Sequence, residues 1–250
     1  MQFWKLTGCG NDFILFDCWD QDFSKEIIPH IPHFCHRKRG IGADGVIFAL
    51  PDQMRLFNCD GSEAEMCGNG IRCLGRFLSS KGRGKAWTIK TLAGPIEVSV
   101  DRDISLRFTH QPQVTLKPWF HCNTGVPHVV YPVEDIKGTD VATLGLKIAH
   151  DPHFPNGTNV NFVQVVSANR LFVRTFERGV NAETEACGTG ALAAGLYALE
   201  TKKGKVPLDV IFSSGDTLRV SVEKKDPCCF IFQQWGQAEL LFQGEITIDG

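Results

Sequence analysis

One six-residue pattern, Glu-x-Cys-Gly-x-Gly, occurs twice in the chain, at 65–70 and at 185–190. Its cysteines, Cys67 and Cys187, are separated by nearly half of the 250 residues, which indicates two halves built on one plan. In each copy the glycines stand where a stretch of apolar residues at helical spacing begins, so we expect each cysteine at a helix N-terminus. There, N–H groups without helical partners and the positive end of the helix dipole favour a thiolate and bind an anion such as a carboxylate.

Two such helix ends acting on one substrate would provide a carboxylate site with a sulfur on either side of the neighbouring carbon. This arrangement suits removal of a proton from one face of that carbon and delivery of a proton to the other face, which inverts the configuration. A thiol whose pKa falls from ~8.5 to ~7 gains only about tenfold in thiolate, whereas enzymes accelerate reactions by ~10⁶-fold or more. We therefore expect the N–H donors to contribute the larger share, by stabilising a carbanion-like transition state. A single copy of the pattern would indicate only a helix start with a buried thiol, and its repetition favours catalysis.

The elements that must position these cysteines are a helix in each half and many short strands. Apolar periodicity predicts helices over 71–82 and 191–204, each ending in basic residues and glycine. Most of the remaining chain consists of short alternating or apolar runs typical of strands, with hairpin turns at 167–169 and 214–216. The segment 117–128 is the expected crossover between the halves. Together these patterns predict an α+β fold rather than βαβ alternation.

Composition excludes several classes of protein. The chain is 43% hydrophobic and 22% charged, and its 26 basic and 28 acidic residues give a net charge of −2. Such a chain has no excess positive field to attract nucleic acid or an anionic membrane surface. No apolar stretch approaches the roughly 18 residues of a membrane span, and the start lacks the pattern of an export signal. We therefore expect a cytoplasmic protein.

The ten cysteines are expected to be free thiols, mostly buried as small hydrophobic residues, because the cytosol keeps thiols reduced. No Cys-x-x-Cys motif occurs, and the spacing from Cys67 to Cys73 matches no common structural zinc pattern. One histidine-rich segment, which contains His30, His33 and His36 beside Cys35, lacks a second ligand pair nearby. We expect neither a metal nor another cofactor.

Several further motifs occur in an order that resembles the diaminopimelate epimerase family, cofactor-independent isomerases that interconvert LL- and meso-diaminopimelate in amino-acid biosynthesis. Diaminopimelate is a precursor of lysine and of peptidoglycan. The resemblance covers nearly the whole chain. Besides the two cysteine motifs, it rests on Gly10–Phe13, Phe57–Asn58, Asp60–Glu63, Arg72–Cys73, Gly125, Pro127–His128, Asn159, Glu177–Gly179 and Glu183–Thr184.

The resemblance implies that Cys67 and Cys187 are the two acid–base thiols. It also implies that residues at the two helix ends bind the α-carboxylate of the substrate. These residues are Gly68, Asn69, Gly188 and Thr189.

By the same resemblance, His128 and Glu177 lie beside the thiols and either take part in their protonation or hold the substrate amine. Histidine suits proton transfer because its ordinary pKa of ~6.5 is close to operating pH. Four residues correspond to positions that hold the far end of the substrate, and one of them, Arg178, could bind the distal carboxylate through two hydrogen bonds. The four are Asn11, Asn58, Asn159 and Arg178.

The fold implied by the resemblance is α+β, with two similar lobes, each a β-barrel-like mixed or antiparallel sheet around a central helix. A pseudo-twofold is expected to relate the lobes, with the active site between them. We expect lobes at 1–118, carrying Cys67, and 119–250, carrying Cys187, and leave open whether the last strand returns to the first lobe. The expected partner is a small amino-acid substrate, with no nucleic acid and no membrane, and a homodimer stays open.

Three features depart from the family pattern. Val126 stands where relatives commonly have asparagine, and Gly45 stands where some have glutamine, so two side chains that could contact the distal end of the substrate are absent. The spacing from Glu177 to Thr184 is one residue longer than usual, which could move Glu177 away from Cys187. Fewer polar contacts weaken discrimination between substrates. The departures therefore suggest relaxed specificity at the distal end.

Three alternatives stay open. The first is a racemase of a smaller amino acid, such as glutamate, on the same fold, or a proline racemase-like enzyme. The second is a racemase that uses pyridoxal phosphate, although no lysine stands in a recognisable motif for that cofactor. The third is a cysteine-rich zinc or redox-sensing module with no catalytic activity.

Overall fold

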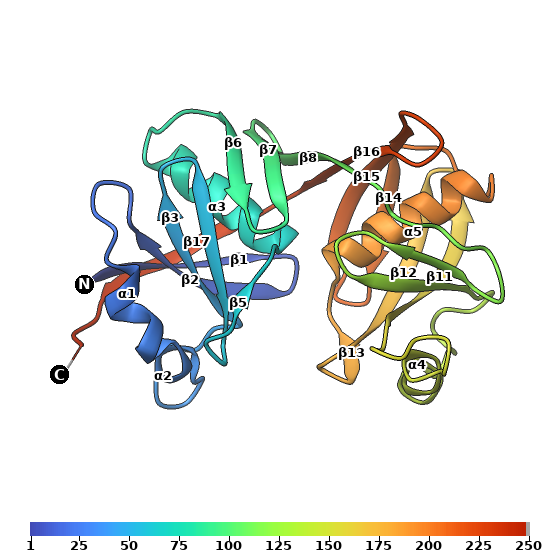
Figure 1. Ribbon diagram of the computed structural model, residues 1–250, viewed down its shortest axis with the longest axis horizontal. Coiled ribbons are helices and arrows are strands. Elements are labelled where there is room, and N and C mark those ends of the chain that lie inside the picture. The colour runs from blue at the N-terminus through green and yellow to red at the C-terminus, as the bar shows by residue number, and fades with distance from the viewer. Residues whose placement is uncertain (249–250) are drawn as a thin grey trace. The chain divides into compact units, whose positions relative to one another are not determined.

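The computed structural model describes residues 1–248 and contains two compact units (Figure 1). The first unit consists of Met1–Leu106 together with the C-terminal segment from Gly236, and the second consists of Arg107–Trp235. The chain passes from one unit to the other within β8 (Ile104–His110), which pairs with β16 (Phe230–Gly236). This division falls earlier in the chain than the expected limits of 1–118 and 119–250, because β8 contributes residues to both units.

The first unit is a mixed sheet with one long helix. Its elements are β1 (Gln2–Gly8), β2 (Asn11–Asp17), α1 (Ser24–Ile27), a 3-10 turn (Ile28–His30), α2 (Ile31–Cys35), β3 (Gly45–Leu50), β4 (Gln53–Asn58), β5 (Glu63–Ala64), α3 (Gly68–Ser80), β6 (Ala86–Thr91), β7 (Gly94–Val100), the start of β8, and β17 (Glu239–Glu245). Strands β2 and β3 are parallel, as are β4 and β6, whereas β1–β2, β3–β4, β4–β5 and β6–β7 are antiparallel. The last strand, β17, pairs antiparallel with β1.

The second unit repeats this order. Its elements are β9 (Phe120–Asn123), β10 (Pro127–Pro132), α4 (Val141–Ala149), β11 (Asn159–Ser167), β12 (Arg170–Glu177), β13 (Ala182–Thr184), α5 (Gly188–Glu200), β14 (Leu208–Phe212), β15 (Thr217–Lys224) and β16. Strands β10 and β11 are parallel, as are β12 and β14, and the hairpins β9–β10, β11–β12, β12–β13 and β14–β15 are antiparallel. The prediction of two similar α+β lobes is therefore confirmed.

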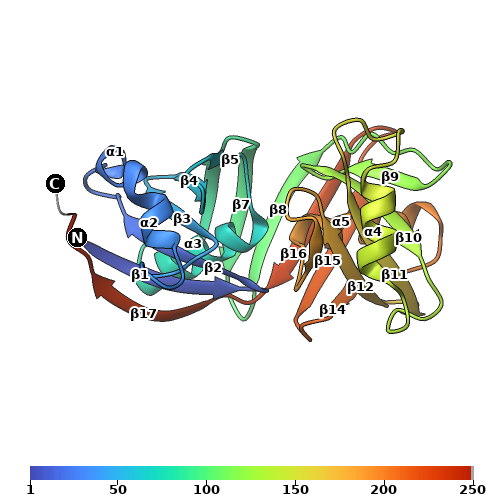
Figure 2. The same ribbon diagram turned by 90° about the horizontal axis from the view of Figure 1, so that it is seen from below.

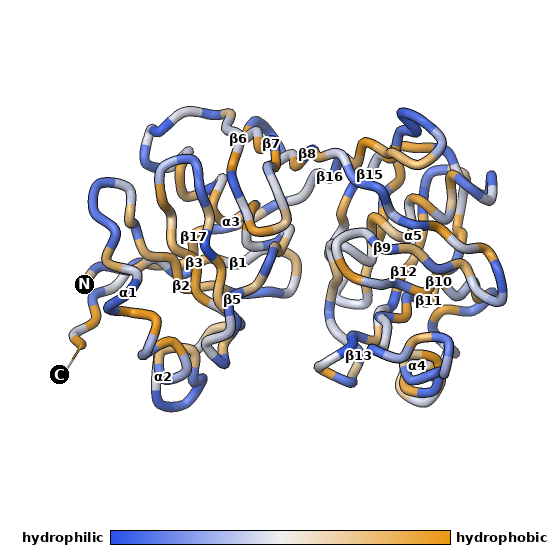
Figure 3. Tube along the Cα trace, viewed as in Figure 1, coloured by the Kyte–Doolittle hydropathy of each residue, from blue (hydrophilic) through white to orange (hydrophobic). Residues whose placement is uncertain are grey.

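Each unit wraps its strands around one central helix, α3 or α5. Helix α5 is apolar almost all round (Figure 3), and every residue from Gly190 to Ala198 is buried. Glycines at matching positions allow each helix to approach a strand closely. A Cβ atom at Gly75 would lie 3.0 Å from Val98 on β7, and one at Gly195 would lie 3.0 Å from Val220 on β15. The repeat therefore extends to the packing of helix against sheet.

The shorter helices cover a second apolar layer in each unit. In the first unit, Ile27 and Ile31 from the helical segment join a cluster that contains Phe16 and Phe48. In the second unit, α4 packs against β11 and β12 over a cluster that contains Phe176 (Figure 2). Among the helices within residues 1–248, none is both long enough and apolar enough to cross a bilayer.

Candidate active site

Both repeated cysteines occupy the N-cap position of a central helix. Cys67 precedes α3 and Cys187 precedes α5, and both have extended backbone angles, with φ −143° and φ −129° respectively. Their carbonyl groups accept the first helical hydrogen bonds, from Ile71 N and from Ala191 N, each at 2.9 Å. The prediction that each cysteine stands at a helix N-terminus is confirmed. The N–H groups of the first turn, which have no helical partners, are therefore adjacent to the sulfur in both units.

Side chains from β16 and from the turn after β9 hold the first turn of α5. Gln234 Nε2 of β16 donates to the carbonyl of Gly188 at 2.9 Å, and Thr124 Oγ1 donates to the carbonyl of Thr189, also at 2.9 Å. These contacts fix the direction in which the first-turn N–H groups point. The first turn of α5 is therefore held in place by side chains outside the helix.

Cys187 is buried, and its sulfur contacts the helix start directly. Gly190 N donates to Cys187 Sγ at 3.3 Å, and the hydroxyl of Thr189 lies 3.5 Å from the same sulfur. Burial raises the pKa of the Cys187 thiol well above its usual range, and the negative charge of Glu177 adds to this effect, while the contacts with Thr189 and Gly190 oppose it. At this position desolvation therefore opposes the ionisation that the helix N-terminus favours, and the raised pKa favours the neutral thiol, which can donate a proton.

Glu177 remains beside Cys187 despite the longer spacing noted in the sequence. Its carboxylate forms a hydrogen bond with the Cys187 thiol and accepts one from Thr184 Oγ1 at 2.8 Å. The additional residue is taken up in the turn after β12, where Asn181 N donates to Glu177 O at 2.8 Å. Gly179 and Asn181 adopt left-handed angles there, with φ 89° and φ 54°. The insertion lengthens this turn and leaves the contact between the carboxylate and the thiol in place.

His128 lies near the start of β10 and is completely buried. Burial lowers its pKa to about 3, and the positive charges of His121 and Arg178 contribute further. The expectation of an imidazole that titrates near operating pH is therefore wrong. The Nδ1 atom of His128 contacts Asn161 Nδ2 at 3.0 Å, and Nε2 has no hydrogen-bond partner within the described residues.

Asn159 and Arg178, two of the residues expected at the distal end of the substrate, lie together in the second unit. Asn159 is buried, and its Oδ1 accepts a hydrogen bond from the backbone N–H of Arg178 at 2.8 Å. The side chain of Arg178 is exposed and donates from Nη1 to the carbonyl of Asn156 at 3.1 Å. Its remaining guanidinium donors can bind a carboxylate.

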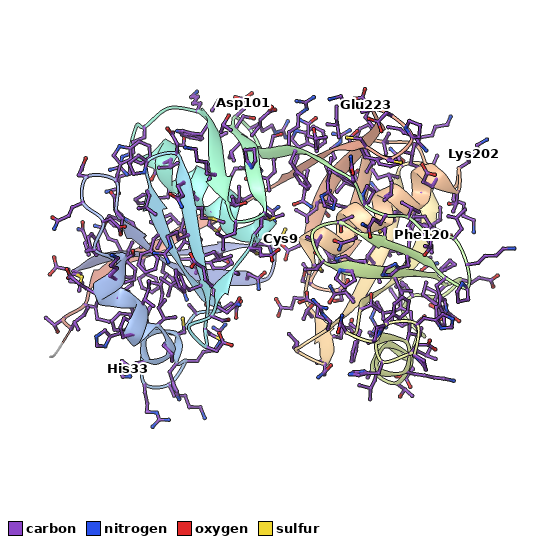
Figure 4. All side chains as sticks on the ribbon, in the orientation of Figure 1. Cys9, His33, Asp101, Phe120, Lys202 and Glu223 are labelled. Carbon is purple, nitrogen blue, oxygen red and sulfur yellow. The ribbon has the colours of Figure 1, made fainter. Side chains whose placement is uncertain are left out.

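In the first unit, the side chain of Asn69 is engaged in internal hydrogen bonds. Its Nδ2 donates to the carbonyl of Cys9 at 3.0 Å and to Asn11 Oδ1 at 2.7 Å, and its Oδ1 accepts from Arg72. Cys9, labelled in Figure 4, belongs to the turn that joins β1 and β2. Asn69 is only 2% exposed. Any contribution of this residue to a carboxylate site must therefore come from its backbone N–H.

The other candidate residues of the first unit lie in turns at the ends of strands. Asn11 begins β2 and donates from Nδ2 to Asp44 at 3.0 Å, whereas Asn58 ends β4 and donates to Ser62 Oγ at 3.0 Å. Gly45 pairs with Asn58 across β3 and β4, and a Cβ atom at this position would lie 2.5 Å from the carbonyl oxygen of Phe57. A side chain at position 45 would therefore require the backbone to move.

The sequence interpretation missed an ionic cluster that positions Asn11. Asp12 accepts hydrogen bonds from the buried Lys5 at 2.6 Å and from Arg37 at 2.8 and 3.1 Å, and Arg37 also binds Asp44 at 2.6 Å. Asp44 in turn holds the amide of Asn11. Although burial raises it, the pKa of Asp12 falls to about 2, because the hydrogen bonds and charges of Arg37 and Lys5 favour the carboxylate.

This cluster predicts a loss of stability in acid. Since the pKa of Asp12 is lower in the folded chain than the ordinary aspartate value of 3.8, its contribution to stability is present above pH ~4 and is lost as pH falls towards 2. This lowering of the pKa corresponds to about 2 kcal/mol in the free energy of unfolding. We expect the stability difference between wild type and Asp12→Asn, measured by urea unfolding, to shrink by more than half of this amount between pH 6 and pH 2.5. Asp20→Asn, at an exposed position, is the control, and a constant difference for Asp12→Asn would contradict the assignment.

The histidine-rich segment forms local contacts. His30 and His33 pack on the ring of Phe34, and His36 Nδ1 accepts hydrogen bonds from the backbone N–H groups of Lys38 and Arg39, each at 3.1 Å. Among residues 1–248, no three His, Cys, Asp or Glu side chains are placed so that they could hold a metal ion.

Comparisons with known proteins cover nearly the whole chain. The family model described as diaminopimelate epimerase matches residues 3–111 and 120–240. The chain is 38% identical to the diaminopimelate epimerase of Aquifex aeolicus, covering 99% of this chain and 98% of that protein. It is 36% identical to that of Moorella thermoacetica over the full length of both chains, and 41% identical to that of Methanothrix thermoacetophila over 88% of each.

Solved structures share the fold. The chain is similar to a phenazine biosynthesis protein of the PhzF family from Bacillus anthracis, with a TM-score of 0.73 and 16% identity over 99% of each chain. It is also similar to a probable proline racemase from Agrobacterium radiobacter, with a TM-score of 0.69 and 15% identity over 99% of this chain and 93% of that one. At these identities the likeness concerns the fold alone.

Proposed function

Because the chain belongs to the diaminopimelate epimerase family, we propose that it interconverts LL- and meso-2,6-diaminopimelate by moving a proton at one α-carbon. It is an isomerase that acts on a small molecule. The observation that carries the proposal is the pair of cysteines, Cys67 and Cys187, each at the N-cap of the central helix of its unit. No comparison supports the alternative of a racemase for a smaller amino acid.

The reaction needs a base and an acid on opposite faces of the α-carbon. The thiolate of one cysteine takes the α-proton and becomes a thiol, and the carbanion that results takes a proton from the other thiol, which becomes a thiolate. The raised pKa of Cys187 supports its role as the acid when the reaction starts from the isomer whose proton faces Cys67. The roles exchange in the reverse direction. Neither direction requires an organic cofactor or a metal.

The α-carboxylate of the substrate binds to backbone N–H groups at the starts of α3 and α5. The donors belong to Gly68, Asn69, Gly188 and Thr189. The engaged amide of Asn69 and the held first turn of α5 support binding by the backbone rather than by side chains. Donors already aimed at the carboxylate stabilise the negative charge that develops when the α-proton leaves.

The far end of the substrate binds Asn11, Asn58, Asn159 and Arg178. Arg178 pairs with the distal carboxylate, and the three amides bind the distal amino acid group. The hydrogen bonds that orient Asn11 and the contact of Asn159 with the Arg178 backbone support a prearranged site.

Chiral chromatography of the amino acids tests the proposed function. Purified protein incubated with LL-diaminopimelate should yield the meso isomer until the two isomers reach equilibrium. Starting from the meso isomer, the same equilibrium mixture should form. L-Glutamate and L-aspartate serve as comparison substrates for relaxed distal specificity, and turnover of either would indicate such specificity. No interconversion of diaminopimelate at high enzyme concentration would reject the assignment.

Two further properties belong to the proposal. The protein acts in the cytoplasm, which keeps thiols in the reduced form that the reaction requires.

We also propose that the protein forms a homodimer. The exposed apolar side chains of β17 support this, namely Leu240, Leu241 and Phe242, each 39–49% exposed. Sedimentation of the purified protein should give the mass of a dimer, and a monomer at micromolar concentration would exclude this part of the proposal.

A further inference from the structure

A buried asparagine that the sequence interpretation did not single out controls the polar contacts of His128. Asn161 lies on β11 and has no exposed surface, and its Nδ2 atom lies 3.0 Å from Nδ1 of His128. An amide nitrogen can only donate a hydrogen bond, so Nδ1 of His128 must be the acceptor. An imidazole that accepts at Nδ1 and is neutral carries its proton on Nε2.

The orientation of the Asn161 amide is fixed independently of His128. Its Nδ2 also donates to the carbonyl of Val129 at 3.0 Å, and its Oδ1 accepts from Thr175 Oγ1 at 3.0 Å. If the amide were turned over, Oδ1 would face the carbonyl oxygen of Val129, and two acceptors would meet without a proton between them. The backbone of β10 therefore determines which end of Asn161 faces the imidazole.

The same asparagine contacts the helix that begins beside Cys187. A Cβ atom at Gly190 would lie 2.3 Å from Oδ1 of Asn161, so this oxygen packs directly against the first turn of α5. Gly190 is also the residue whose N–H reaches the sulfur of Cys187. Asn161 thus connects His128 on β10 to the helix start that carries the thiol.

We propose that Asn161 is a positioning residue that holds His128 as the neutral Nε2–H tautomer, so that His128 serves as a hydrogen-bond donor to a carboxylate oxygen of the substrate. The assignment of the partner rests on the proposed function and on the chemistry of an amino-acid substrate. Its amino groups are protonated and can only donate, whereas its carboxylates accept. The Nε2–H of His128 is completely buried and has no partner among residues 1–248, so a substrate carboxylate would satisfy it.

The charged surroundings of His128 favour this neutral form. His121 of β9 and Arg178, which follows β12, are the titratable groups that act on the imidazole, and both are cations when protonated. No carboxylate is among the groups that change the pKa of His128. A second proton on His128 would therefore be both buried and repelled, and the side chain cannot act as a general base that cycles through the imidazolium.

Nitrogen NMR of protein labelled with ¹⁵N-histidine tests the tautomer directly. In wild type we expect the His128 signals of an unprotonated Nδ1 and a protonated Nε2, unchanged between pH 5.5 and pH 9. His128→Gln identifies the signals by their loss. A protonated Nδ1 in wild type, or titration of His128 within this range, would overturn the inference. This measurement needs no catalytic activity, so it separates the inference from the proposed function.

The variant Asn161→Asp tests the role of the amide. A carboxylate at this position can only accept, so the proton of His128 should move to Nδ1 or a second proton should bind, and kcat should fall by about 10²-fold. A new inflection should appear in the pH profile of kcat. Asn161→Leu, which has neither donor nor acceptor, should lower kcat without adding that inflection. Asn169→Asp, an exposed substitution near the end of the same strand, is the matched control. An unchanged tautomer and rate in Asn161→Asp would contradict the positioning role.

Discussion

Replacing Cys67 or Cys187 with serine is expected to lower kcat for epimerisation by about 10³-fold in both directions. Each direction needs one sulfur to remove the proton and the other to deliver it, and a serine hydroxyl is far too weak an acid to replace either. The rate of LL-to-meso conversion measures the loss. Cys59→Ser and Cys228→Ser, which change exposed cysteines in the first and second units, are matched controls that should keep wild-type rates.

The two serine variants should nevertheless differ in the chemistry that they retain. Each keeps one sulfur and can still remove the α-proton from the face that this sulfur serves. A substrate analogue with a leaving group on the β-carbon needs only this step, because the departing group carries away the electron pair. We expect each variant to eliminate from one diastereomer of the analogue and not from the other. Retention of more than a tenth of the epimerase activity by either variant would contradict the two-sulfur scheme.

Removing the charge of Glu177 is expected to make Cys187 a stronger acid. Burial is the main reason for the raised pKa of Cys187, and the Glu177 carboxylate raises it further. In Glu177→Gln, the thiol should therefore ionise at lower pH, and kcat should fall by about 10²-fold because the carboxylate no longer orients the thiol. The pH dependence of Cys187 alkylation by iodoacetamide, followed by mass spectrometry, measures the first effect.

The control for this experiment lies two residues before Cys187. Glu185 is exposed, and Glu185→Gln removes a charge of the same sign from the same loop. It should leave both the alkylation curve and kcat close to those of wild type. If the pH dependence of Cys187 alkylation is the same in Glu177→Gln as in wild type, or moves to higher pH, Glu177 does not raise the pKa of this thiol.

The sequence predicted the features that depend on local pattern. The repeated motif located both helix N-termini, because the position of a cysteine relative to glycines and to apolar periodicity is a local property. The alternating strands and the repeat predicted two similar α+β lobes. The boundaries of the two units were harder to predict from the sequence. Strand β17 pairs with β1, and this contact joins the two ends of the chain.

The ionisation states could not be predicted in the same way. The helix dipole at Cys187 is a local effect, but the burial that opposes it arises from strands far away in the chain. His128 similarly has an ordinary sequence context, and its neutral state results from complete burial near His121 and Arg178. The protonation state depends on both the local sequence and the burial produced by the folded chain. The sequence pattern shows only the local effect.

Two polar groups were missed, although the sequence held a weak signal for each. Asn161 is a polar residue between Val160 and Phe162 in a strand-like run, where a buried amide needs partners. Asp12 follows Asn11 directly, but its partners Lys5 and Arg37 come from separate elements. Only the folded chain brings these charges together.

The most direct test of the two-sulfur mechanism is the fate of hydrogen during the first turnover in D₂O. Mass spectrometry of both isomers should show deuterium at the reacting α-carbon of the newly formed product, while the remaining substrate keeps its proton. This result follows if one sulfur removes the substrate proton and the other delivers a proton exchanged with solvent. A product that retains the original proton, or label that enters substrate and product equally, would contradict the mechanism.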